Sequence, residues 1–267
     1  MSRMTLNQKD KDEFLKTAIY AAKEASKVIL KSNQKTVKTY KAKTDLVTST
    51  DHESERVIID IIRSKHPDHS ILAEESGNFK KHLDYNWIID PLDGTTNFVH
   101  SYPLFGVSIA LSHKDKIIVG VVVELPSLNV YSAIQNGPAY CNDKIIKVSN
   151  NNKLIDSLLV TGFGYEHGNL WEDNMKLFKI FTDITQGVRR SGAAAIDICH
   201  AASGKTDGYW EYDIKPWDIA AGSIIAKQAG ALITGIKGEE FSIWDNQILA
   251  TNGKIHGEML KIITSTI

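Results

Sequence analysis

Hydrophobic residues recur every three to four positions in two segments near the start of the chain. Residues 10–33 keep this spacing throughout, which predicts an amphipathic helix with one buried face. A second segment carries apolar residues at positions 57, 58, 61 and 62 and stops before Pro67. We expect a second helix there, and Thr50 or Asp51 is its expected N-cap.

The hydrophobic pattern then becomes typical of β-strands. Short apolar runs at 71–73 and 87–89 predict buried strands, and alternating or β-branched runs follow at 105–111, 117–123 and 130–134. Short turns join the later runs, and Asn136-Gly137 is typical of a hairpin turn. We therefore expect an antiparallel sheet with the two helices on one face.

A polar stretch at 149–153 separates this region from a second pattern, in which strands and helices alternate. Strands are expected at 158–161, 208–211, 231–234 and 248–251, and helices at 171–181, 194–202, 219–229 and 256–263. We place a boundary between residues 1–148 and 149–267, as two halves of one compact unit. The predicted fold class is mixed α/β of the α+β type, with sheets layered between helices.

Composition narrows the class of protein. The formal net charge of −1 over 267 residues gives no reason to expect a nucleic-acid or membrane partner. Cys141 and Cys199 lack CxxC spacing, which favours reduced thiols in a cytosolic protein. The N-terminus is polar, and no stretch approaches the ~20 apolar residues of a membrane span. We therefore expect a cytoplasmic protein.

The densest chemistry lies at residues 87–100, WIIDPLDGTTNFVH. Pro91 has a fixed φ and no N–H donor, so we expect the strand to end there. Asp93 is a good N-cap, and Gly94 allows a ligand to approach the backbone. The N–H groups from Gly94 to Thr96 would then open a helix or turn toward an anion.

Asp90 and Asp93 would repel that anion unless a cation lies between them. A divalent metal that bridges carboxylate and phosphate resolves this conflict, and oxygen ligands favour Mg²⁺. The alternative is a capped turn with two solvated aspartates. The preceding apolar strand and the Gly-Thr-Thr loop favour the metal–phosphate interpretation.

Other clusters are weaker when each is considered alone. Adjacent acids on a strand point to opposite sides, so only one of Glu74 and Glu75 can face a site. Asp218 lies before a run of small residues, which implies close packing, although an N-cap role alone would explain it. The acids at 45–51 can also be explained by capping, and loop 190–194 either lines a pocket or starts a helix. The sequence lacks the GxSxG and P-loop motifs.

Taken together and in order, these clusters resemble the inositol monophosphatase family of lithium-sensitive metal phosphatases, in its bacterial form. The matching segments are DLVTSTD at 45–51, LAEESG at 72–77, residues 87–100, and EYDIKPWDIAAGSIIAKQAG at 211–230. The resemblance implies a layered αβαβα sandwich of the inositol monophosphatase/fructose bisphosphatase fold. It also implies a Mg²⁺-dependent phosphomonoesterase with roughly two to three ions, usually a homodimer.

The resemblance also assigns roles to residues. Most of the implied metal ligands lie in residues 1–148, and residues 149–267 complete the site. The implied metal ligands are Glu74, Asp90, Asp93, Asp218 and the carbonyl of Leu92. Glu74 and Thr95 would position the attacking water, and Asp51 would support Thr95; together with Asp90 they form the implied catalytic set. The implied substrate contacts are Asp93, Gly94, Thr95, Gly192, Ala194, Glu211 and Asp218.

This sequence departs from the family pattern at three places. Lys41 and Lys43 both match a family lysine, Ala193 replaces a hydroxyl residue of animal members, and residues 213–216 differ from theirs. These departures bear on the sugar specificity and leave the metal chemistry untouched.

The leading expectation is hydrolysis of inositol 1-phosphate, a small-molecule phosphomonoester. Within the same fold, the alternatives are 3′-phosphoadenosine 5′-phosphate, fructose 1,6-bisphosphate, histidinol phosphate and NADP. From another class, the alternative is a regulatory binding module in RNA processing or transcription.

Overall fold

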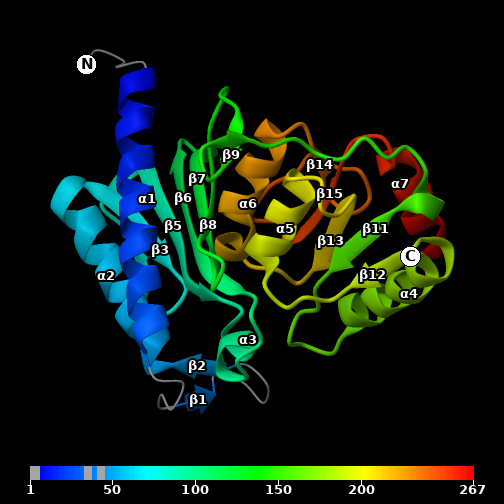
Figure 1. Ribbon diagram of the computed structural model, residues 1–267, viewed down its shortest axis with the longest axis horizontal. Coiled ribbons are helices and arrows are strands. Elements are labelled where there is room, and N and C mark those ends of the chain that lie inside the picture. Colours follow the sequence, from blue (N-terminus) through cyan, green and yellow to red (C-terminus); the bar gives the residue numbers. More distant parts are fainter. Residues whose placement is uncertain (1–6, 33–37, 41–45) are drawn as a thin grey trace.

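The computed structural model describes residues 7–32, 38–40 and 46–267. Lys41, Lys43 and Asp45, which the sequence analysis singled out, lie outside the described residues. The described elements form five layers: two helices, a large sheet, two helices, a smaller sheet and two helices (Figure 1). The predicted layered α+β sandwich is therefore confirmed.

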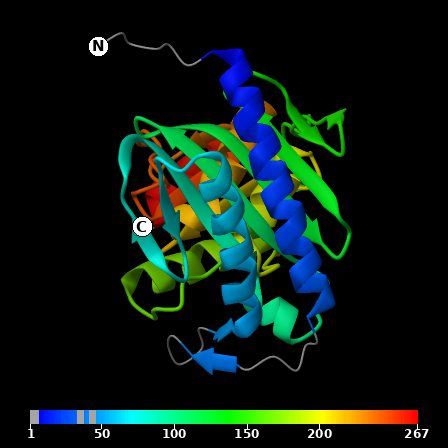
Figure 2. The same ribbon diagram turned by 90° about the vertical axis from the view of Figure 1, so that its left-hand side faces the viewer.

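Helices α1 (Gln8–Lys31) and α2 (Ser49–Lys65) form the first layer and cross one face of the large sheet, as Figure 2 shows. Both predicted amphipathic helices are confirmed. Their apolar faces pack on the sheet around the fully buried ring of Trp87. The predicted N-cap of α2 is wrong. Thr48 is the N-cap, and Asp51 three residues on accepts its N–H in a capping box.

The large sheet has the strand order β10-β9-β8-β7-β6-β5-β3-β4. All neighbours are antiparallel except β3 and β5, which are parallel. A separate antiparallel pair is formed by β1 (Lys38–Tyr40) and β2 (Leu46–Thr48). The strands of the large sheet are β3 (His69–Ala73), β4 (Gly77–Phe79), β5 (His82–Asp93), β6 (Phe105–His113), β7 (Lys116–Leu125), β8 (Asn129–Ile134), β9 (Ala139–Cys141) and β10 (Lys144–Ile145).

Strand β5 does not end at Pro91, contrary to the prediction. It continues to Asp93, and its pairing with β6 shifts register between Asp90 and Asp93. Such a bulge places proline where no ladder donor is needed and re-aims the neighbouring side chains. Gly94 then takes a left-handed conformation (φ 84°) and serves as the N-cap of α3 (Thr95–Val99). The prediction that Asp93 caps this helix is therefore wrong.

The smaller sheet has the order β12-β11-β13-β15-β14, and β11 is parallel to both of its neighbours. Its strands are β11 (Leu158–Thr161), β12 (Gly187–Arg189), β13 (Gly208–Tyr212), β14 (Leu232–Thr234) and β15 (Gln247–Thr251). Helices α5 (Ala194–Ala202) and α6 (Pro216–Gln228) lie between the sheets, and α4 (Asn169–Ile184) and α7 (His256–Thr266) cover the outer face (Figure 1). A short helix, η1 (Leu154–Asp156), precedes β11. The predicted strand–helix alternation is confirmed, whereas β12 was missed.

Small residues bring α6 close to its neighbours, as the sequence predicted. A Cβ atom on Gly222 would lie 2.9 Å from the Cβ of Ile198 on α5, and one on Gly120 of β7 would lie 2.7 Å from the Ala221 carbonyl oxygen. Ser108 on β6 also donates to the Trp217 carbonyl. The start of α6 is therefore fixed against the large sheet.

The division of the chain at 148/149 stays an interpretation.

None of the helices in the described ranges is long and apolar enough to cross a lipid bilayer.

Candidate active site

A cleft of about 590 Å³ opens where the end of β5 meets the starts of α5 and α6. Most of the residues implied by the resemblance line it. They are Glu74, Asp90, Leu92, Asp93, Gly94, Thr95, Gly192, Ala194, Glu211 and Asp218. The fold therefore brings together segments that are more than a hundred residues apart. Their chemical roles stay predictions, whereas their placement in one cleft is observed.

Asp90 and Asp93 lie on the two sides of the β5 bulge, and both are buried. Asp90 Oδ1 accepts the N–H of Leu92 at 2.9 Å. The two carboxylate oxygens of Asp93 accept the N–H groups of Ala194 at 3.1 Å and Ala195 at 2.9 Å. Asp93 therefore caps α5 instead of its own short helix and joins the two halves of the chain.

Glu74 follows β3 and faces the cleft, which agrees with the choice of this acid over Glu75. The N–H of Glu74 donates to the Ile89 carbonyl, 3.2 Å away, so its backbone still follows β5. The N–H of Glu75 donates to the Glu55 carboxylate at 2.9 Å. Glu55 is buried on α2, and this contact fixes the turn that presents Glu74.

Asp218 lies in the first turn of α6, after Pro216 at the first helical position. Its Oδ2 accepts the N–H of Lys215 at 2.9 Å. Lys215 is the N-cap, so the interpretation of Asp218 as an N-cap is wrong. Asp218 occupies the third helical position and reaches back to the cap. This leaves its second oxygen available to a ligand in the cleft.

Thr95 and Asp51 form a hydrogen-bonded pair behind the floor of the cleft. The Thr95 hydroxyl lies 2.9 Å from Asp51 Oδ1 and 3.1 Å from the Leu92 carbonyl, so it donates to one of two acceptors. Asp51 Oδ2 accepts the N–H of Thr48 at 2.9 Å and its hydroxyl at 2.5 Å. Asp51 does not line the cleft itself. Its contact with Thr95 is the one that the implied support of Thr95 requires, and the role itself stays a prediction.

Four acids form the floor of the cleft: Glu74, Asp90, Asp93 and Asp218. Their electrostatics favour a bound cation. Burial raises the pKa of Asp90 well above its ordinary value, and the charges of Glu74, Asp93 and Asp218 raise it further. Burial and the charge of Glu74 raise the pKa of Asp218 in the same way. Burial also raises the pKa of Asp93 to about 7, although the amides of α5 oppose the shift. Buried like charges of this kind are stable together only when protonated or when paired with a cation.

The donor set fits Mg²⁺, since all donors are carboxylate or carbonyl oxygens. In the described ranges, no three His, Cys, Asp or Glu side chains are already arranged closely enough to hold a metal ion by themselves. An open set suits Mg²⁺, because this ion keeps several waters and is usually completed by substrate phosphate. The residues present therefore fit the metal that the sequence predicted.

The opposite wall of the cleft carries Glu211 on β13. Burial raises the pKa of Glu211 to about 7, whereas the hydrogen bond from Tyr209 and the charge of Arg190 oppose the shift. A Cβ on Gly162 would overlap the Glu211 carboxylate, so a larger residue there would displace that carboxylate. Gly192 has a φ of 88° and therefore the left-handed conformation that favours glycine.

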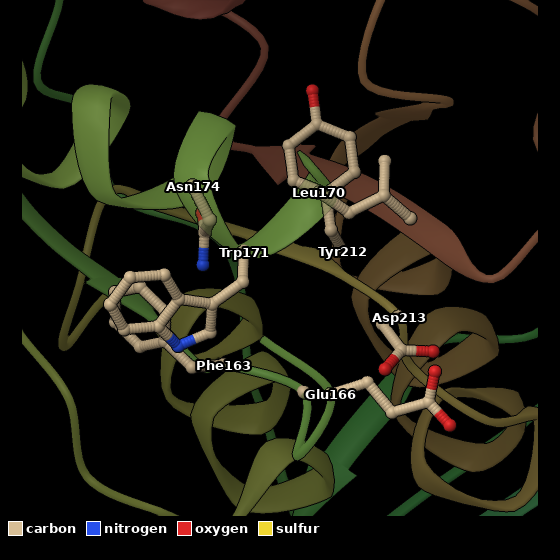
Figure 3. A pocket seen from close by; sticks show the side chains of 8 residues that line it. Phe163, Glu166, Leu170, Trp171, Asn174, Tyr212 and Asp213 are labelled. Atoms are coloured by element: carbon tan, nitrogen blue, oxygen red, sulfur yellow. The ribbon is translucent and has the colours of Figure 1, made fainter. Parts of the chain in front are cut away.

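Sequence reasoning missed two parts of this wall. Asp197 is an acid on the largely apolar helix α5 and lines the cleft, and its position among apolar residues was the available signal. The loop after β11 carries Phe163 and Glu166, which also line the cleft. Figure 3 shows a hollow that continues from it, with Phe163 and Trp171 on one side and the carboxylates of Glu166 and Asp213 on the other.

The chain was compared with known proteins. The sequence model of the inositol monophosphatase family matches residues 10–267. The chain is 46% identical over 224 residues to the inositol-1-monophosphatase of Synechocystis sp. PCC 6803, covering 83% of this chain and 78% of that protein. It is 39% identical over 258 residues to the putative Nus factor SuhB of Neisseria meningitidis serogroup B, covering 95% and 99%.

Solved structures agree with the sequence comparisons. The inositol monophosphatase from Anabaena (Nostoc) sp. PCC 7120 superimposes with a TM-score of 0.85 at 39% identity, covering 96% of this chain and 97% of that one. An IMPase/NADP phosphatase in complex with Mg²⁺ and phosphate superimposes with a TM-score of 0.83, covering 94% and 95%. It is 24% identical, so that likeness concerns the fold.

Proposed function

The chain belongs to the inositol monophosphatase family of phosphatases, and we propose that it is a Mg²⁺-dependent enzyme that hydrolyses inositol 1-phosphate to inositol and phosphate. One observation carries the proposal. Asp90, Asp93 and Asp218 are brought together with Glu74 at the floor of one cleft, beside the Thr95–Asp51 pair. Such a floor attracts divalent cations and, through them, a phosphate group.

Thr95 orients the attacking water in this proposal. When its hydroxyl donates to Asp51 Oδ1, the oxygen keeps its lone pairs for a hydrogen of that water. Thr48 donates twice to the other oxygen of Asp51, so the carboxylate is held and the direction of the Thr95 hydroxyl is fixed. Glu74 faces the same space and accepts the second hydrogen of the water.

Bound Mg²⁺ supplies a water of lowered pKa and offsets the negative charge of the phosphate and of the leaving oxygen. Asp90, Asp93, Asp218, Glu74 and the Leu92 carbonyl are the residues that would hold it. Gly94 and Thr95 line the cleft, and their N–H groups are proposed to bind phosphate oxygens. No side-chain nucleophile is required, so the water attacks phosphorus directly.

The choice of inositol 1-phosphate rests on the wall opposite the floor. Glu211 and the loop from Gly192 to Ala194 match the family positions that contact an inositol ring, and all line the cleft. The relative from Synechocystis carries the name inositol-1-monophosphatase, which supports this substrate. The similarity to a putative Nus factor favours a regulatory role less strongly, because a binding module has no need of the acidic floor. Homodimer formation and lithium sensitivity stay predictions from the resemblance.

Phosphate release tests the proposal. The purified protein is assayed with inositol 1-phosphate, 3′-phosphoadenosine 5′-phosphate and fructose 1,6-bisphosphate, with Mg²⁺ or with EDTA, and with and without lithium. We expect Mg²⁺-dependent turnover that is fastest on inositol 1-phosphate. A preference for either bisphosphate would replace the substrate and keep the metal site. No Mg²⁺-dependent turnover of any ester would contradict the proposal.

A further inference from the structure

Arg190 is exposed and lines the cleft, together with Gly192 and Glu211. Its guanidinium lies against Gly192, since a Cβ on that glycine would be 3.1 Å from Arg190 Nη1. The side chain lines the same cleft as Glu211 and Asp197, and its charge opposes the rise in the pKa of both acids. No ion pair of Arg190 occurs within the described part of the chain, so its donors face the cleft without a fixed partner.

Asp197 on α5 lines the same cleft as Arg190 and is 2% exposed. Its Oδ1 is buried and has no hydrogen-bond partner among the described residues. A buried carboxylate oxygen without a partner is costly, so its presence on an otherwise apolar helix needs a cause. Burial raises the pKa of Asp197 well above its ordinary value, and a hydrogen bond with Ser191 and then the positive charge of Arg190 oppose this rise.

The loop that carries Arg190 is fixed by residues of α3 and of the end of β5, next to the proposed phosphate-binding N–H groups. The Asn97 amide on α3 donates to the Ser191 carbonyl at 2.8 Å and to the Leu104 carbonyl at 2.7 Å. Asp93 holds the N–H groups that follow this loop at the start of α5. The position of Arg190 relative to the phosphate loop is therefore set by contacts with the floor of the site.

We infer that Arg190 selects substrates whose leaving alcohol carries several hydroxyl groups, and that Asp197 is a positioning residue for its guanidinium. The inference rests on the proposed phosphatase function and deepens it. A guanidinium presents several donors in a fixed plane, and the carboxylate of Glu211 on the same wall is an acceptor. Neighbouring hydroxyl groups both donate and accept, so a cyclitol or sugar fits this pair.

The other cation of this wall has a partner already. Lys215 Nζ lies 3.2 Å from Asp213 Oδ1, two residues earlier in the loop before α6. Of the lysine and arginine side chains that line the cleft in the described part of the chain, Arg190 is therefore the one whose donors are more available to a ligand. Arg189 provides a matched control, because it is exposed and does not line the cleft.

The test compares kcat and KM for inositol 1-phosphate with those for p-nitrophenyl phosphate, whose alcohol has no further hydroxyl. We expect Arg190→Ala to lose at least ten times more kcat/KM on inositol 1-phosphate than on p-nitrophenyl phosphate. The loss should lie mainly in KM, since contacts made equally in the bound and transition states change binding alone. Arg190→Lys should recover only part of it, because lysine lacks the planar donor arrangement.

Asp197→Asn keeps the shape and removes the charge, and it should raise KM for inositol 1-phosphate about three- to tenfold in the same selective way. Arg189→Ala should leave the ratio of the two substrates unchanged. Equal losses of Arg190→Ala on both substrates, or an equal effect of Arg189→Ala, would overturn the inference. Greater loss on fructose 1,6-bisphosphate than on inositol 1-phosphate would also overturn it, since Arg190 would then bind a second phosphate.

Failure of the proposed function is distinguishable from failure of this inference. Wild-type protein that hydrolyses p-nitrophenyl phosphate but not inositol 1-phosphate would contradict the proposed substrate. The same variants are then compared on glucitol 6-phosphate, another polyhydroxylated ester. A selective loss there would still support the role of Arg190, and an unselective loss would overturn it.

Discussion

Two buried acids, Asp93 of the cleft and Glu124, lie only two strands apart in the large sheet. Their pKa values shift in opposite directions. Gly106 on β6 pairs with Asp93 on one side and with Glu124 of β7 on the other. Burial alone would raise the pKa of Glu124, but His200 and Lys205 outweigh it and lower the pKa to about 2. Their nitrogens lie 3.4 and 3.8 Å from Glu124 Oε2.

Three acids of the cleft have no such partners among the described residues. Asp90, Asp93 and Asp218 form no ion pair within the described ranges, and the charges acting on Asp90 belong to other acids. Their pKa values rise where that of Glu124 falls. The difference teaches that this fold can neutralise a buried acid from its own side chains and does not do so at the cleft. The cleft acids are therefore the ones that need an external cation.

The largest expected effect is the loss of activity when an acid of the cleft is replaced. Asp90→Asn removes one negative charge from the floor and keeps an oxygen that accepts the Leu92 N–H. We expect kcat/KM for inositol 1-phosphate to fall at least about a thousandfold, which corresponds to about 4 kcal/mol of barrier. Thermal unfolding without metal should occur at the same or a higher temperature, because a repulsion is relieved.

The matched control for this variant is Asp84→Asn, at an acid of β5 whose side chain is 44% exposed. It should keep wild-type kcat/KM. If Asp90→Asn retained activity within about tenfold, roughly 1.4 kcal/mol of barrier, Asp90 would not belong to the catalytic centre.

A smaller effect is expected in the pH dependence of stability. The pKa of Glu211 is raised from 4.5 to about 7, so the folded protein binds more protons than the unfolded chain between these values. The free energy of unfolding therefore falls as pH rises through this window, by up to about 3 kcal/mol from this group. Urea unfolding of the metal-free protein at pH 5 and pH 8 measures the change.

The isosteric variant Glu211→Gln isolates that contribution, since the amide oxygen can still accept the Tyr209 hydroxyl. We expect the variant to lose less stability than the wild type between pH 5 and pH 8. An identical loss in both proteins would show that Glu211 does not titrate in this range.

The smallest effect is expected at Glu124, the acid that the protein neutralises with its own side chains. Glu124→Gln removes the charge that His200 and Lys205 neutralise, and we expect a loss of about 2 kcal/mol at pH 7 with little change in kcat/KM. Because the pKa of Glu124 is lowered, its contribution is present above about pH 4.5 and is lost as pH falls toward 2. Urea unfolding at pH 7 and pH 4 measures both values.

A thousandfold loss of activity in Glu124→Gln, with the fold intact, would break the comparison. The control is Asp115→Asn, in the exposed turn between β6 and β7, which should leave both stability and activity unchanged. The wild type and Glu124→Gln should approach each other in stability at low pH.

Much of the architecture could be predicted from the chain itself. The apolar period places α1 and α2, and the bounds of β11 and α5 were predicted to the residue. The short strand β12 carries only three residues and no alternation, so nothing in the pattern marks it. Local capping was predicted less well. Thr48, Gly94 and Lys215 are the N-caps. Asp51 and Asp218 lie three residues after their caps and accept the N–H of the cap, whereas Asp93 accepts N–H groups of α5.

The sequence by itself determined which chemical groups are present and where each strand or helix delivers them, since both follow from local spacing. The tertiary structure decided which groups meet. Asp93 caps a helix that begins about a hundred residues later, and Arg190, Asp197 and Glu211 come to line one cleft. A periodic pattern shows that a face is buried but not which face packs against it. The partners of buried acids, and hence their charge at neutral pH, are therefore set only when the layers come together.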